Sequence, residues 1–168
     1  MGYETTSPQI ASKIKEWLQP FLGAVCQNPM TCPDWINFHF YIMGCTTDVT
    51  GLQEKLQEVL DVVKLYPSIK GALLTEVGLL QSHPGETCDG NTIQKAMTNM
   101  FQALDEVKMP NDPAKPLVQY ISWFNKINTG KSFDLSLVEA GTGNVTDLGR
   151  VYAGLCSKKQ EYMNSVSK

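Results

Sequence analysis

The chain has 168 residues, of which 42% are hydrophobic and 18% are charged, and its formal net charge is −3. A chain of this length buries roughly 70% of the surface that it exposes when unfolded, so it can form one domain with a hydrophobic core. The basic residues are Lys apart from a single Arg, and no cluster is longer than two residues, which excludes the phosphate-neutralising stripe of a nucleic-acid-binding protein.

The opening segment, MGYETT, has neither the basic nor the apolar region of a secretory signal. We expect residues 1–6 to form a flexible N-terminal segment before a single domain over residues 7–166. Ser7 and Pro8 are typical of a helix start, and apolar residues then recur with the helical period until Pro20, which predicts an end or a kink. No run of eighteen apolar residues occurs, so we expect a soluble protein without a transmembrane segment.

The longest apolar stretch is Trp35–Met43, whose composition fits either a buried strand or a helix. We favour a helix because the segments around it show the helical period. Residues 48–65 and 68–81 are predicted as two further helices, each with its apolar residues on one face.

The clearest helical stripe covers residues 92–108. Three prolines follow closely and interrupt it, since proline removes an N–H donor and clashes with the preceding turn. Another helix is predicted from Pro113 or Pro116 to about Ile127, and a last one from about Thr146. These segments predict an all-α protein, a single-domain bundle of six or seven amphipathic helices.

The chain contains five cysteines, so at least one has no partner within the chain. Cys26 and Cys32 lie on either side of Pro29 in an irregular loop, and they are our first choice for a disulfide. Cys156 has helical spacing to apolar neighbours, which is typical of a buried thiol. With a glycosylation sequon at Asn144, these features slightly favour an extracellular or secretory location over the cytoplasm.

The loop HPGETCD brings four possible metal ligands together: His83, Glu86, Cys88 and Asp89. Structural zinc usually takes its ligands as two spaced pairs, and the chain has no second Cys or His pair. We therefore interpret this loop as a polar connection in which Asp89 or Asn91 caps the next helix, and we expect no metal and no other cofactor.

Residues 128–132, NTGKS, resemble the end of a phosphate-binding loop. The first glycine of that motif is missing, because Asn125 stands at its position, and the preceding residues have the period of a helix where the motif needs a strand. Gly130 is better explained as the end of a helix.

His39 lies in an aromatic neighbourhood, where a lone histidine is more often a hydrogen-bonded core residue than a ligand. We expect this neighbourhood to pack against the methionine-rich face of residues 93–107. The same residues could instead line a pocket for an apolar small molecule, namely Trp35, Phe38, His39, Met97, Met100, Phe101 and Trp123.

No catalytic motif is present in the sequence. Cys45 or Cys88 could act as a nucleophile with His39 or His83, but no surrounding signature supports such thiol chemistry. Low surface charge and many aromatic residues are typical of protein interfaces. We therefore expect a non-catalytic protein-binding or structural subunit that engages another protein or copies of itself; the alternatives are a carrier of an apolar small molecule and an enzyme without a recognisable motif.

Overall fold

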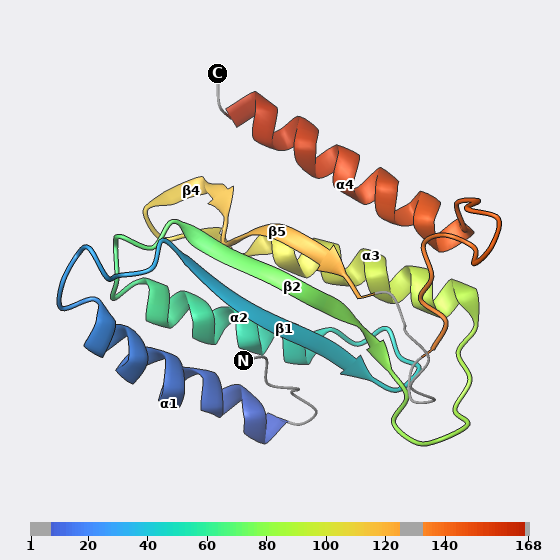
Figure 1. Ribbon diagram of the computed structural model, residues 1–168, viewed down its shortest axis with the longest axis horizontal. Helices are drawn as coiled ribbons and strands as arrows, with labels where there is room; N and C mark the ends of the chain where they lie inside the picture. Colours follow the sequence, from blue (N-terminus) through green and yellow to red (C-terminus); the bar gives the residue numbers. More distant parts are fainter. Residues whose placement is uncertain (1–7, 125–132, 167–168) are drawn as a thin grey trace.

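Helices and strands alternate along the chain, so the fold is α/β and the predicted all-α helical bundle is wrong (Figure 1). The computed structural model describes residues 8–124 and 133–166, with side chains for residues 14–124 and 133–157. The predicted flexible segment and the NTGKS motif therefore lie outside the described residues. The elements in chain order are α1 (Pro8–Val25), β1 (Trp35–Met43), α2 (Thr50–Val63), β2 (Gly71–Leu80), α3 (Gly90–Glu106), β3 (Lys108–Met109), β4 (Asp112–Pro116), β5 (Val118–Trp123) and α4 (Asp147–Val166).

Four of the predicted helices are confirmed as α1, α2, α3 and α4. The α1 helix does not end at Pro20 but continues through it to Val25. The Asp89 side chain accepts a hydrogen bond from the N–H of Thr92 and so caps α3, as expected for an aspartate at this position. Within the described part of the chain, no helix combines the length and the apolar character needed to cross a membrane.

Three segments that were predicted as helices are strands. Trp35–Met43 forms β1, most of residues 68–81 forms β2, and the segment after Pro116 forms β5. Strands of a parallel sheet can be buried on both faces, so they form continuous apolar runs that periodicity does not separate from buried helices. In β2 and β5 the sequence spacing of the apolar residues was also misleading. Irregularities in the strand register place successive core residues three positions apart in the sequence, where a regular strand places them two apart.

The three long strands form a parallel sheet in the order β1-β2-β5, while β3 and β4 form a separate antiparallel pair. The connections β1-α2-β2 and β2-α3-β5 both place their helix on the same face of the sheet. In Figure 1, α2 and α3 lie behind the strands, α1 packs beside α2, and α4 packs beside α3. The hydrophobic core lies between the sheet and these two central helices.

The core is built from aliphatic and methionine side chains of the helices and the inward residues of the strands. Its fully buried members include Leu52, Leu56 and Val59 of α2, Leu74 and Leu79 of β2, and Met97, Met100 and Leu104 of α3. Burial of such side chains stabilises the fold by roughly 1.5–3 kcal/mol each, relative to leaving them exposed.

Both edges of the parallel sheet are capped by side chains from helices. The N–H of Gly44 donates to the carbonyl of Leu80 in β2. Because backbone groups alternate in direction along a strand, the even-numbered residues of β1 face β2 and the odd-numbered residues direct their N–H and C=O groups away from it. The carbonyl of His39 is one of these, and the ammonium of Lys55 lies 3.4 Å from it. At the other edge, the hydroxyl of Tyr152 donates to the carbonyl of Ile121. These contacts reduce the tendency of the edges to pair with further strands.

A core position tests this packing. Phe101 of α3 is buried and meets Tyr152 of α4 edge to face, with 5.9 Å between the ring centroids. We expect Phe101→Ala to lower the free energy of unfolding by about 3–5 kcal/mol, because burial is lost and a cavity forms. The measurement is urea denaturation, with the exposed Val145→Ala as the control that changes stability little. A small loss together with strong binding of an apolar dye would instead favour the carrier hypothesis.

The pH dependence of stability tests the environment of Lys55. Only 2% of this residue is exposed, and burial lowers the pKa of its ammonium to about 8. Between about pH 8 and pH 10.5 the unfolded chain holds a proton that the folded chain has lost, so the free energy of unfolding rises with pH by up to about 3 kcal/mol. Lys55→Met should remove this rise, whereas Lys64→Met, which changes an exposed lysine, should retain it; an unchanged pH profile in Lys55→Met would contradict the assignment.

Candidate functional site

The face of the sheet opposite α2 and α3, called the outer face below, is the candidate site. None of the described helices crosses it, and it is turned towards the viewer in Figure 1. A parallel sheet normally has both faces covered, so this arrangement is unusual. The outer face carries Trp35, Asn37, His39 and Tyr41 of β1, Leu73, Thr75 and Glu76 of β2, and Tyr120 of β5.

A β-bulge in the central strand creates the polar centre of the outer face. Leu74 pairs with Phe38 and Val77 pairs with Phe40, and all four side chains belong to the core. Two residues of β2 therefore stand opposite the single residue His39. Because Leu74 and Val77 both point inward, Thr75 and Glu76 are left for the outer face, and bulges commonly re-aim side chains in this way near functional sites.

Glu76 is the centre of a cluster with His39 and Tyr41. The Tyr41 hydroxyl donates to the Glu76 carboxylate, and Nδ1 of His39 lies 3.4 Å from the same oxygen. The side chains of His39 and Glu76 remain 21% and 37% exposed, so a partner can reach both. Beside them, the Thr75 hydroxyl donates to Oδ1 of Asn37 at 2.6 Å.

A carboxylate that orients an imidazole is also found in catalytic triads, where a nucleophile completes the arrangement. The nearby hydroxyls of Tyr41 and Thr75 donate to Glu76 and Asn37 instead. Cys45 and Cys88, considered above as nucleophiles, are bonded to each other and so have no thiolate to offer. These hydroxyls and thiols therefore do not complete a nucleophile–histidine–carboxylate arrangement with His39 and Glu76.

Two aromatic side chains form an apolar area at one end of the outer face. Trp35 and Tyr120 meet edge to face with 5.6 Å between their centroids, and Tyr120 is 64% exposed. Gly71 lies beneath them with a φ of 154°, and a Cβ there would collide with Gln119 and contact Trp35. A side chain at this position would therefore be conformationally strained, and it would displace the amide of Gln119. At the opposite end, Phe124 stacks edge to face on Tyr41.

The carboxyl ends of β1 and β2 are joined by a disulfide and a carboxylate. Cys45 is bonded to Cys88, and the Glu86 carboxylate accepts hydrogen bonds from the Cys45 N–H at 2.9 Å and from the Ser82 N–H at 2.6 Å. These bonds, with that from Cys45 the strongest influence, hold the pKa of Glu86 below its ordinary value. The disulfide and these hydrogen bonds hold the loop that follows β1 against the loop that follows β2.

The residues considered as weak metal candidates thus have other partners. Glu86 holds the two loops, Cys88 is in the disulfide, Asp89 caps α3, and Nδ1 of His83 lies 3.4 Å from the carbonyl of Pro84. Within the described residues, no group of three or more His, Cys, Asp or Glu side chains is arranged to hold a metal ion.

The residues predicted to line an apolar pocket are divided between two places. Phe38, Met97, Met100, Phe101 and Trp123 lie together in the core. Trp35 and His39 lie on the outer face. The Trp123 indole N–H donates to the carbonyl of Leu135 at 3.2 Å, which satisfies its polar atom inside the protein.

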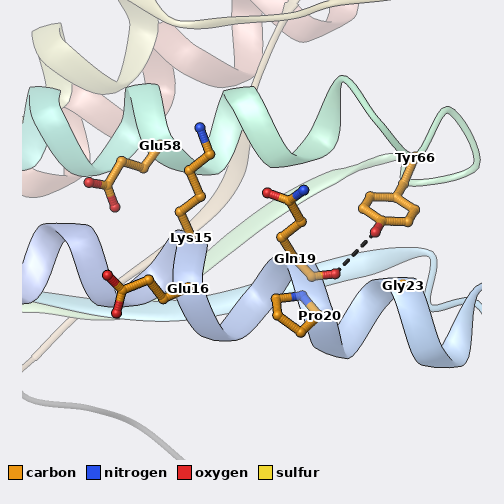
Figure 2. A pocket seen from close by; sticks show the side chains of 7 residues that line it. All are labelled: Lys15, Glu16, Gln19, Pro20, Gly23, Glu58 and Tyr66. Carbon is orange, nitrogen blue, oxygen red and sulfur yellow. Dashed lines mark hydrogen bonds between the residues drawn. The ribbon is translucent and has the colours of Figure 1, made fainter.

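A groove lies between α1 and α2, with a volume of about 690 Å³ (Figure 2). Lys15, Glu16 and Gln19 line it from α1, Glu58 lines it from α2, and Tyr66 closes one end. The sequence alone does not indicate this groove, because the spacing of Glu58 on α2 is that of an ordinary charge on a solvated helix face. A proline inside an amphipathic helix was the signal that could have indicated an irregular helix surface.

Comparisons of the chain with protein-family models, with curated proteins and with solved structures each found no match.

The disulfides can be compared with each other. The structure contains the Cys26–Cys32 disulfide and also Cys45–Cys88, and their sequence separations are 6 and 43 residues. Since a longer closed loop restricts the unfolded chain more, replacing Cys45 and Cys88 by Ala should cost about 4 kcal/mol and replacing Cys26 and Cys32 about 2 kcal/mol. Denaturant titrations of the two double variants measure this difference, and equal losses would contradict it.

Proposed function

We propose that the protein is a non-catalytic recognition module that binds another protein through the outer face of its sheet. The observation that carries this proposal is a parallel sheet whose helices, within the described residues, cover one face only. Leu135 and Phe124 cover Gly78 and Tyr41 at one end of this face. Over the rest of it no described helix packs, so the layer is incomplete and a partner can supply the missing cover.

The chemistry of the outer face favours a protein as the partner. Most of its side chains are aromatic, or are polar without a full charge. Glu76 carries a negative charge, and the three strands contain no Lys or Arg. Aromatic anchors surrounded by hydrogen-bonding groups are typical of protein interfaces, whereas nucleic-acid surfaces need cations. The complementary partner presents an Arg or Lys opposite Glu76 and an apolar side chain against Trp35 and Tyr120.

The two disulfides support an oxidising setting, so we propose a secretory or extracellular location. The free Cys156 is partly exposed. A carrier function is less favoured because Met97 and Met100, two of the side chains that would line its pocket, are fully buried in the core.

Selection from a displayed peptide library tests the proposal. Peptides chosen on the wild-type protein should contain a basic residue beside an aromatic or aliphatic one. Their affinity should fall at least about tenfold for Glu76→Lys and for Tyr120→Ala, because a buried charge contact or an aromatic anchor is worth more than about 1–2 kcal/mol. Binding is measured by surface plasmon resonance, with circular dichroism to show that each variant is folded.

The control is Leu65→Ala, which truncates another exposed hydrophobic residue at the end of α2 and should leave peptide affinity unchanged. Selected peptides that bind Glu76→Lys and Tyr120→Ala as well as the wild type would overturn the proposal. A wild-type dimer in sedimentation equilibrium that dissociates in both variants would instead identify a second copy of the chain as the occupant.

A further inference from the structure

We infer that Asn144 is the attachment site of an N-linked oligosaccharide, added while the chain passes through the secretory pathway. The segment Asn144-Val145-Thr146 is the only Asn-x-Ser/Thr sequence without a central proline in the whole chain. Such a sequence directs glycan attachment in secreted proteins. The inference rests on one part of the proposed function, the secretory location, which is supported by the two disulfides independently of the sequon.

A short hairpin presents the Asn144 side chain to solvent. Val138 and Val145 form an antiparallel bridge, and the N–H of Glu139 donates to the carbonyl of Asn144 at 2.8 Å. Val145 is turned towards α4, since a Cβ at Gly149 would lie 2.8 Å from its Cγ1. Neighbouring side chains of a paired segment point to opposite sides, so Asn144 is directed away from α4.

The surroundings of the hairpin leave room for a bulky sugar. Residues 138–145 are all exposed. A Cβ added at Gly141 or Gly143, in the turn of the hairpin, would meet no atom of the described residues within 4 Å. In Figure 1 this loop lies beside the amino end of α4, to the right of the strands, so a glycan on it would leave the outer face accessible.

The amide of Asn144 can carry a sugar and keep its contact within the hairpin. Nδ2 donates one hydrogen to Oε2 of Glu139 at 3.3 Å, and a primary amide has a second N–H. In the attachment step Nδ2 forms a bond to C1 of the sugar and the bond from C1 to the diphosphate of a lipid carrier breaks. The diphosphate leaves with the electron pair, and the amide releases one proton. The remaining N–H can still donate to Glu139 in the folded protein.

The hydroxyl of Thr146 has a different partner once the protein is folded. It donates to the carbonyl of Ser136 at 2.7 Å and accepts a hydrogen bond from the N–H of Gly149 at 3.0 Å, which caps the start of α4. A transferase that reads this hydroxyl must therefore act before the hairpin folds. Attachment to the growing chain meets this requirement.

Production of the full chain behind a cleavable secretion signal in a eukaryotic host tests the inference. Intact-mass spectrometry is applied to the medium and to the cell lysate, because attachment precedes export. We expect a glycan on most wild-type chains, and an amidase that removes N-linked glycans should release it and convert Asn144 to Asp. Asn144→Gln should carry none, whereas Asn111→Gln, which changes an exposed asparagine outside any sequon, should match the wild type.

Variants at the third position of the sequon separate acceptor chemistry from folding. Thr146→Ser keeps a hydroxyl and should still be modified, whereas Thr146→Ala should not. Val145→Ala leaves the sequon intact and should be modified like the wild type. A glycan that persists in Asn144→Gln or in Thr146→Ala would contradict the assignment.

An unmodified Asn144 in the wild-type chain would overturn the inference. If Cys26–Cys32 and Cys45–Cys88 are then found as disulfides, the proposed oxidising location still stands; if these cysteines are free thiols, that proposal fails as well. Recognition by the outer face is tested separately, since the selected peptides should bind with the same affinity before and after the glycan is removed.

Discussion

The central strand β2 has to keep Leu74 and Val77 in the core although two residues separate them. Regular pleating would turn one of these side chains outward, and the bulge at Thr75 and Glu76 avoids this. The pairing of β2 with both neighbouring strands accommodates that extra residue, since the register with β1 and the register with β5 each shift where β2 bulges. The bulge also provides the outer face with its one carboxylate.

The same bulge explains why the strand could not be predicted from its sequence. A spacing of three between Leu74 and Val77 is typical of a helix, and β5 repeats the effect between Val118 and Ile121. The helices were predictable because each buries a single stripe at regular spacing, as α3 does with Met97, Met100 and Leu104.

The candidate sites were less predictable than the helices. His39 stood out because of its aromatic neighbours, but its partner Glu76 lies 37 residues further along the chain and only the parallel pairing of β1 and β2 brings them together. Glu58 has the sequence spacing of a solvated helix charge, and only the packing of α1 on α2 places it in the wall of a groove. In both places, residues far apart in the sequence are brought together by the fold, and a single sequence does not show which residues these are.

The way in which the sheet is closed explains where binding surfaces can form. Lys55 and Tyr152 occupy the two edges, and the Cys45–Cys88 disulfide with Glu86 joins the carboxyl ends of the strands. Because these contacts lie at the edges and the carboxyl ends, the outer face is the part of the sheet on which the proposed partner would bind.

The α1–α2 groove arises for a different reason. Leu18 and Leu22 of α1 join the hydrophobic core, whereas Pro20 and the polar side chains near it line the groove on the exposed side of the helix pair. The outer face therefore presents aromatic side chains around one carboxylate, whereas the groove presents charged and polar side chains of two helices.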